Sequence, residues 1–357
     1  MHIDFAVALA GLLVGFTVGL TGMGGGALMT PILVLLFKTQ PLAAVSSDLV
    51  ASMVMKPVGA SVHGRRGTVN WSLVRWLAAG SVPSAFGGVF ILKHLGNGDV
   101  IEERLKVALG VALMVASASI VAKGFLQLHR ARRREGLMLA GKPIAVEPFV
   151  LKPIPTLLIG VLGGVIVGMT SVGSGSLIIV SLLLLYPMLS SKELVGTDLT
   201  QAIPLVASAA LGHILFGDFR LSLTSSILVG SLPGVFVGAR LSSRAPDGLI
   251  RPVLVIVLLA SAFKLLGLSN TWLGVAMAAF VLLALPIWGI VDASIRPDHH
   301  WRVAGLSKKR WVRMQVLGAP VGMGLFPAMV YFARIRPKLN AAALMSYVSV
   351  WGDELSA

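Results

Sequence analysis

The stretch "GFTVGLTGMGGGAL", residues 15–28, lies between two hydrophobic runs. Glycine is a poor helix former, so the glycines at Gly22, Gly24, Gly25 and Gly26 predict a break in a helix. A second stretch, "GVIVGMTSVGSGSL" at residues 164–177, has the same pattern about 150 residues later. The residues that recur in the same order are Gly15, Gly19, Thr21, Gly24, Gly26 and Leu28, which match Gly164, Gly168, Thr170, Gly173, Gly175 and Leu177.

The match continues after a one-residue insertion in the second copy. Glycine, proline, histidine and aspartate seldom recur in a shared order by chance, so we interpret the chain as an internal duplication. The later matching positions are Asp48 and Asp198, His63 and His213, Gly67 and Gly217, Gly80 and Gly230, Ser81 and Ser231, Pro83 and Pro233, and Gly88 and Gly238.

The composition is that of a membrane protein. The chain has 357 residues, of which 56% are hydrophobic and 13% charged, and its mean hydropathy is +0.87. A helix needs about 20 apolar residues to cross a bilayer. We therefore expect an all-α, polytopic helical membrane protein with two inverted five-segment repeats. The expected segments are 5–20, 27–37, 42–62, 72–92 and 105–121, then 156–169, 176–186, 195–216, 221–241 and 249–266.

These segments give a predicted domain organisation. Membrane repeat 1 covers 1–122, a basic linker 123–152, and membrane repeat 2 covers 153–268. An additional transmembrane helix is expected in 269–292, followed by a basic loop and C-terminal tail in 293–357. The tail from 314 to 332 is followed by Arg334, Arg336 and Lys338, which favour an interfacial segment over a span.

The positive charge predicts the topology. The net charge is +15, and cytoplasmic loops of membrane proteins are enriched in Lys and Arg. The linker has seven Lys or Arg and two acidic residues, so we expect it and the loop 293–313 in the cytoplasm. The loop 93–106 has three of each and is expected outside, as is the N-terminus. Five segments per half then place the halves in opposite orientations, an arrangement typical of secondary transporters.

Several function classes lack support. The chain has no cysteine, which excludes disulfides and thiolate chemistry. No HExxH, paired-carboxylate or Ser-His-Asp pattern indicates an enzyme, and we predict neither a metal nor a cofactor. We attribute the positive charge to membrane topology and expect no nucleic-acid partner. The oligomeric state is not predicted.

The glycine-rich stretch has several possible interpretations. "GMGGGA" at 22–27 satisfies G-x-G-x-x-A, but it follows a membrane segment and the second copy loses the pattern. A phosphate-binding loop lacks the following Lys-Ser/Thr. An intramembrane serine protease would need Ser174, where the first copy has glycine. Helix packing is the strongest alternative, and it fits the four-residue spacing of Gly11, Gly15 and Gly19, and of Gly160, Gly164 and Gly168.

The short segments favour an anion site. Segment 27–37 is about 16 Å long as a helix, which spans only half a bilayer. Its N-terminus would expose N–H groups and a positive dipole end near the midplane. Two such helix ends that face each other would bind a small anion between them. We expect protons to be a second transported partner. The substrate-binding candidates are Thr21, Gly22, Gly24, Gly25, Gly26, Ser47, Thr170, Ser171, Gly173, Ser174, Gly175 and Thr197.

Ionisable residues within the segments are the candidates for proton coupling. Asp48 and Asp198 start the third segment of each half, where they would be either helix N-caps or proton carriers. His63 and His213 end the same segments and are either interfacial or part of a proton relay. Lys56 has no counterpart in the second half, and we expect it to extend toward the cytoplasmic surface, the alternative being that it pairs with the substrate.

The doubled glycine stretch, together with "SSDL" at 46–49 and "GTDL" at 196–199, resembles the TauE/SafE family of sulfite and organosulfonate exporters over residues 5–268. The resemblance implies a multi-pass carrier of small sulfur oxyanions or sulfonates in the bacterial inner membrane, driven by the proton gradient. Some relatives import thiosulfate through cysteines, a mechanism that a chain without cysteine would not share. An anion channel and an intramembrane enzyme are the alternatives.

Overall fold

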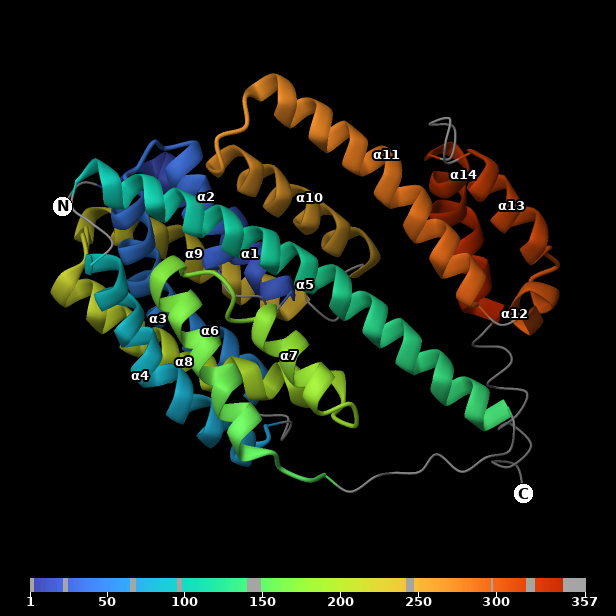
Figure 1. Ribbon diagram of the computed structural model, residues 1–357, viewed down its shortest axis with the longest axis horizontal. Helices are drawn as coiled ribbons and strands as arrows, with labels where there is room; N and C mark the ends of the chain where they lie inside the picture. Colours follow the sequence, from blue (N-terminus) through green and yellow to red (C-terminus); the bar gives the residue numbers. More distant parts are fainter. Residues whose placement is uncertain are drawn as a thin grey trace. The chain divides into compact units, whose positions relative to one another are not determined.

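The computed structural model describes residues 3–21, 25–64, 69–94, 98–139, 149–241, 247–296, 298–318 and 325–342. These residues form helices and short connections, without a strand among them (Figure 1). The all-α prediction is confirmed. The helices before Ser269 are α1 (Phe5–Thr21), α2 (Gly26–Leu35), α3 (Pro41–Gly64), α4 (Trp71–His94), α5 (Asp99–Leu139), α6 (Pro153–Thr170), α7 (Leu177–Leu185), α8 (Ser191–Phe216), α9 (Leu221–Leu241) and α10 (Asp247–Leu265).

The remaining helices follow Ser269. They are α11 (Asn270–Ile295), α12 (Asp298–Val303), α13 (Lys308–Gly318), α14 (Leu325–Val330) and the π-helical turn η3 (Tyr331–Ile335). Every predicted segment corresponds to one helix, and the bounds differ mainly at α5, which continues into the basic linker as far as Leu139. A helix of 41 residues is about 60 Å long, twice the thickness of a bilayer core.

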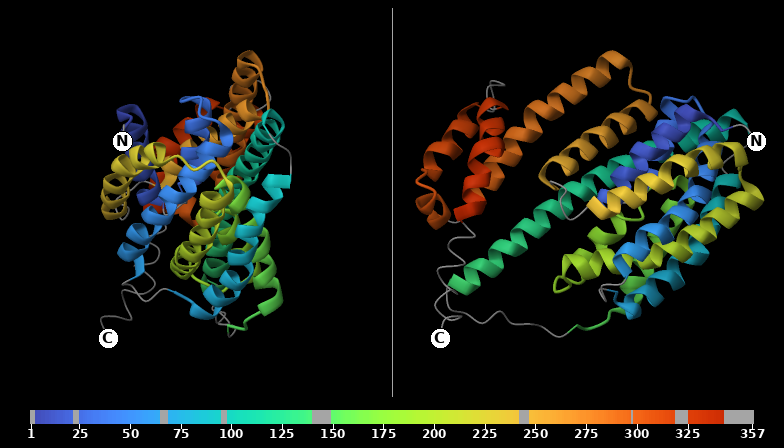
Figure 2. Two further views of the ribbon diagram at one scale, coloured as in Figure 1. Left: turned by 90° about the vertical axis from the view of Figure 1, so that its left-hand side faces the viewer. Right: turned by 180° about the vertical axis from the view of Figure 1, so that it is seen from behind.

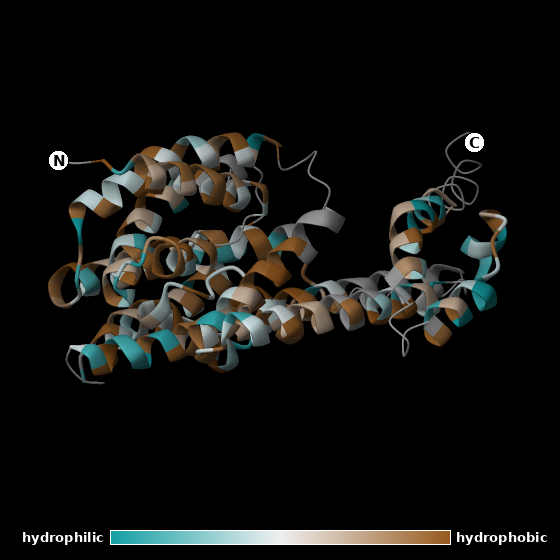
Figure 3. Ribbon diagram, turned by 90° about the horizontal axis from the view of Figure 1, so that it is seen from above, coloured by the Kyte–Doolittle hydropathy of each residue, from teal (hydrophilic) through white to brown (hydrophobic). Residues whose placement is uncertain are grey.

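The chain forms two compact units. Unit 1 comprises residues 1–129 and 143–269, and unit 2 comprises 130–142 and 270–357. Among the described residues, five helices, all in unit 1, are long and apolar enough to cross a membrane, by length and composition. Brown, hydrophobic residues run along most of the helices in Figure 3. Together these features describe a multi-pass membrane protein.

Glycines let four helices of unit 1 pack in close pairs. The backbone of α1 lies against that of α9 (Figure 2), and α4 lies against α6 in the same way. A methyl group added at Gly15 would collide with the carbonyl oxygen of Ser231, and one at Gly164 would lie 2.5 Å from the carbonyl oxygen of Ser81. The helix-packing interpretation is therefore confirmed for the glycines at four-residue spacing, which are Gly11, Gly15, Gly19, Gly160, Gly164 and Gly168.

The two halves of unit 1 make matching contacts with each other. The Arg220 N–H, just before α9, donates to Ser47 Oγ at 3.4 Å. The Asn70 N–H, just before α4, donates to Thr197 Oγ1 at 3.0 Å. Each contact joins a third helix of one half to the start of a fourth helix of the other. Ser47 and Thr197, which are matching positions in the sequence, thus make the same kind of contact.

Candidate functional site

The glycine-rich stretches precede two short helices. Helix α2 has 10 residues and α7 has nine, so each is about 15 Å long and spans half of a bilayer core. Gly25 precedes α2 and Ser176 precedes α7, and neither N-terminus has a side-chain cap. The N–H groups of an uncapped first turn, with the positive end of the helix dipole, favour an anion nearby.

The N-terminus of α2 touches the loop that precedes α7. A Cβ atom at Gly26 would collide with the carbonyl oxygen and the hydroxyl of Ser171, so only glycine fits there. The loop itself needs left-handed backbone, with φ of +59° at Ser171, +116° at Gly173 and +150° at Gly175. We call the α1–α2 pair and the α6–α7 pair the two hairpins. The hairpins therefore meet, and the close backbone contact between them explains why residue 26 is glycine.

Asp48 joins the two hairpins. It lies in α3 and is almost fully buried. Its Oδ2 accepts hydrogen bonds from Thr30 Oγ1 of α2 at 3.0 Å and from Ser171 Oγ at 2.7 Å. Its Oδ1 is buried without a hydrogen-bond partner in the described part of the chain. One oxygen thus fixes the hairpins together, and the other is left for a proton or a ligand.

Asp198 has the corresponding position in α8 but different partners. Gln201 Nε2 donates to Asp198 Oδ1 at 3.3 Å, and Ser81 Oγ donates to Gln201 Oε1 at 3.3 Å. Asp198 Oδ2 is buried and, among the residues described, has no hydrogen-bond partner. Both aspartates therefore hold one satisfied and one unsatisfied carboxylate oxygen inside the protein.

The N-cap interpretation of the two aspartates is wrong. Helix α3 begins at Pro41 and α8 at Ser191, so Asp48 and Asp198 lie two turns inside their helices. The N-cap of α8 is Ser190, which forms a capping box with Glu193. The start of the first of these helices was predicted within one residue, so the error lay in assigning Asp48 to the helix start; the start of α8 was placed four residues too late, because Ser191, Lys192 and Glu193 lower the local hydropathy.

Lys56 makes contacts that were not the expected ones. Its Nζ donates to Ser174 Oγ at 2.6 Å, and its charge interacts with the carboxylates of Asp198 and Asp48. The expected extension toward the cytoplasmic surface is therefore wrong. The available signal was a lysine within an apolar helix, two turns after an aspartate, which by default marks a functional site.

Four of the predicted substrate-binding hydroxyls form hydrogen bonds with backbone groups. Thr21 Oγ1 donates to the Thr17 carbonyl at 2.8 Å, and Thr170 Oγ1 donates to the Ile166 carbonyl at 2.6 Å. Ser47 and Thr197 accept the N–H groups that precede α9 and α4. The structure brings together Gly26, Ser171 and Ser174 with the charged residues. Gly22 and Gly24 lie outside the described residues, as does the side chain of His63.

His213 is buried and paired at both ring nitrogens. Its Nε2 lies 2.8 Å from the Gly168 carbonyl oxygen, and its Nδ1 lies 2.8 Å from Ser46 Oγ. A carbonyl only accepts hydrogen bonds, so Nε2 carries a proton, and in the neutral ring Nδ1 accepts from Ser46. This pairing joins α8 to α3 and α6. A part of His213 in proton transfer stays a prediction.

Comparison with known proteins gives a consistent picture. Residues 7–265 match the family described as "Sulfite exporter TauE/SafE". The chain is 39% identical over 263 residues to the "Probable membrane transporter protein YjnA" of Bacillus subtilis (strain 168), covering 73% of this chain and 99% of that protein. It is 22% identical over 245 residues to YdhB of the same organism, also described as a probable membrane transporter protein, covering 69% and 93%. No solved structure matches.

Proposed function

The chain belongs to the sulfite exporter TauE/SafE family and is a membrane transporter, and we propose that it is a secondary transporter of a small sulfur oxyanion or sulfonate. The proposed setting is the bacterial inner membrane, with the linker 123–152 and the loop 293–313 in the cytoplasm. One observation supports the proposal. The Lys56 ammonium donates a hydrogen bond to Ser174, where the two hairpins meet, and its charge interacts with the buried carboxylates of Asp48 and Asp198.

The donors around the hairpin ends suit an oxyanion. Lys56 supplies an ammonium, Ser174 supplies a hydroxyl, and the first turns of α2 and α7 supply backbone N–H groups. Sulfite, sulfate and sulfonates present several oxygen acceptors on one small centre, which matches several donors that converge from different helices. In the proposed bound state the anion replaces Ser174 as the partner of Lys56.

The charge balance links anion binding to protons. With Asp48 and Asp198 both ionised and Lys56 charged, the site has a net charge of −1 and repels an anion. When one carboxylate takes a proton on its unsatisfied oxygen, the net charge becomes zero and the repulsion is removed. Binding of the anion then favours binding of the proton, and this reciprocity is the requirement for proton-coupled transport.

The decisive experiment is uptake of labelled sulfite, sulfate and short alkylsulfonates into proteoliposomes, with and without a pH gradient. We expect saturable uptake of at least one of these anions, stimulated by the gradient. Flux that does not saturate and ignores the gradient would instead indicate an anion channel. No flux with any of the three, together with turnover of one of them, would indicate an enzyme.

Lys56→Gln tests the site itself. The variant removes the charge and keeps a hydrogen-bond donor, so we expect anion affinity to fall by at least about tenfold, since hydrogen bonds to charged groups are worth about 1.5–3 kcal/mol. The matched control is Lys106→Gln, which removes an exposed lysine of α5 and leaves affinity unchanged. Well-folded Lys56→Gln protein with normal affinity would place the anion site elsewhere.

A further inference from the structure

The C-terminal hairpin, defined as α13 with residues 325–342, packs along the last part of α11. At one end Gly289 of α11 adjoins both Gln315 of α13 and Ala328 of α14. Toward the other end the Lys308 ammonium of α13 donates to the Arg296 carbonyl at 2.8 Å. Helix α13 therefore runs antiparallel to α11, and its C-terminal end lies near Gly289 in the last third of that helix.

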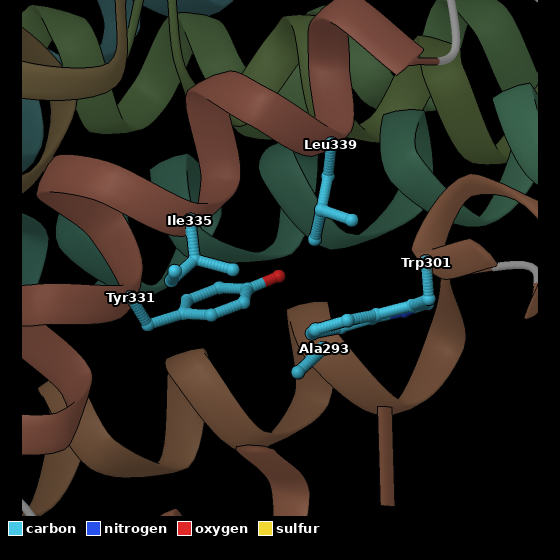
Figure 4. Close-up of a cluster of buried hydrophobic side chains, with 5 residues drawn as sticks. All are labelled: Ala293, Trp301, Tyr331, Ile335 and Leu339. Carbon is cyan, nitrogen blue, oxygen red and sulfur yellow. The ribbon is translucent and has the colours of Figure 1, made fainter. Parts of the chain in front are cut away.

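The second arm of the hairpin returns in the same direction as α11. Tyr331 Oη donates to Asp292 Oδ2 at 2.6 Å, and Arg336 Nε lies 3.7 Å from the same oxygen. A hydrophobic cluster fixes this arm, with Tyr331, Ile335 and Leu339 against Ala293 and Trp301 (Figure 4). The order along the arm, from Ala328 at Gly289 to Tyr331 at Asp292, sets the register.

The register defines a tip and a base for the hairpin. Asp292 and its partner Arg296, whose Nε lies 3.1 Å from Asp292 Oδ2, mark where α11 stops being apolar. The contacts at Gly289 lie about 5 Å from this ion pair, toward the N-terminus of α11. The tip, defined by Leu317 and Phe326, extends about 5 Å beyond these contacts in the same direction. If α11 crosses the membrane, the tip lies about 10 Å deeper than the ion pair.

The tip exposes large apolar side chains. Leu317 and Phe326 are each 75% exposed, and large apolar side chains that are exposed close together mark an interaction surface. The other exposed apolar residues near the tip are Met314, Val316 and Met329. This end of the hairpin is therefore suited to an apolar environment.

The base of the hairpin has only positive charges. Residues 308–342 contain seven Lys or Arg and no Asp or Glu. Lys308 pairs with Asp298 at 3.0 Å and Arg336 with Asp292. The other five are exposed, and they are Lys309, Arg310, Arg313, Arg334 and Lys338.

We propose that the C-terminal hairpin inserts its tip into one leaflet of the membrane while its base binds the phosphates of anionic lipid headgroups. Segments that lie in the interface bury their apolar face by about 5–10 Å, which agrees with the depth set by the contacts on α11. Basic residues near an anionic membrane surface strengthen binding to it. The hairpin follows the part of the chain that matches the family, so the inference is independent of the transported anion.

Single cysteines in the full-length protein test the insertion, because the chain has no cysteine of its own. Leu317→Cys and Phe326→Cys place a thiol at the tip, and Ser307→Cys places one at an exposed position of the base. Each protein is reconstituted in nanodiscs of phosphatidylcholine with phosphatidylglycerol, which leave both membrane faces accessible. We expect an impermeant maleimide to label the tip at least about tenfold more slowly than the base.

A fluorophore on each thiol reports what covers it. Lipids with a quencher on the acyl chain should quench the label at 317 and leave the label at 307 bright. In the triple variant Lys309→Gln, Arg310→Gln, Arg313→Gln, or in phosphatidylcholine alone, protection of the tip should fall. Equal labelling of tip and base would overturn the proposal. So would a tip that is protected without quenching and forms disulfides between two chains, because a second copy would then cover it.

Discussion

At the scale of single residues, the unsatisfied carboxylate oxygens of Asp48 and Asp198 are the features to test. Asparagine has the same shape as aspartate and still accepts hydrogen bonds from Thr30 and Ser171, but it takes up no proton. For Asp48→Asn and Asp198→Asn we expect uptake driven by a pH gradient to fall by at least about fivefold. Exchange of labelled for unlabelled anion in the absence of a gradient should fall less.

The control for both variants is Glu103→Gln, which neutralises an exposed carboxylate of α5. It should change neither gradient-driven uptake nor exchange. Equal losses of uptake and exchange in the aspartate variants would mean that the carboxylates only hold the hairpins in place. His213→Gln provides a weaker test of the same kind, because both ring nitrogens already have partners.

The residues of the site differ in how far the sequence reveals them. Ser171, Ser174 and Gly26 were predicted because a broken helix places its first turn at mid-membrane. The bonds that join them to Asp48 and Lys56 were not predicted, because they connect residues more than 100 positions apart. Their pairing depends on how the helices pack, which a hydropathy pattern does not contain.

At the scale of helices, the adjacent glycines Gly25 and Gly26 should differ in their response to the same substitution. Gly26→Ala forces a methyl group into the Ser171 backbone, so we expect the free energy of unfolding to fall by about 1–3 kcal/mol. Gly25 has right-handed helical backbone, and its Cβ would lie at an ordinary 3.6 Å from Met55 Cε. Gly25→Ala should therefore be neutral within about 0.5 kcal/mol.

Thermal unfolding of the two variants in the same detergent measures this difference. Similar melting temperatures for both would show that the hairpins do not meet as closely as the contact at Gly26 requires. The comparison separates glycines needed for packing from glycines next to the candidate anion site, a distinction that the sequence pattern "GMGGGA" does not make.

At the scale of the whole molecule, the prediction is opposite orientation of the two halves. Cysteines introduced at Gln127 and Asn97 should react with impermeant reagents from opposite sides of the membrane, with position 127 in the cytoplasm. Labelling in sealed inside-out and right-side-out vesicles measures this. Labelling of both positions from the same side would contradict the inverted arrangement of repeats.

The helices were predictable because membrane segments are long, apolar and bounded by charge. The expected segment 221–241 matches α9 (Leu221–Leu241) at both ends. The end of α5 was not predictable in this way, because the basic residues after Lys123 lower the hydropathy without breaking the helix. The C-terminal hairpin was expected only as an interfacial segment, since its core depends on Trp301 and Tyr331 meeting across α12 and η3.

The pairing of α1 with α9 has a consequence for how the protein is made. The glycine face of α1 matches no helix of its own half, and 200 residues separate Thr21 at its end from Leu221 at the start of α9. At ribosomal speeds this delay is on the order of ten to forty seconds. During that time α1 lies in the lipid, or beside the insertion machinery, and its glycine face has no helix to pack against. A chain cut between the halves would leave that face permanently unmatched, so neither half should be stable until the other has been synthesised.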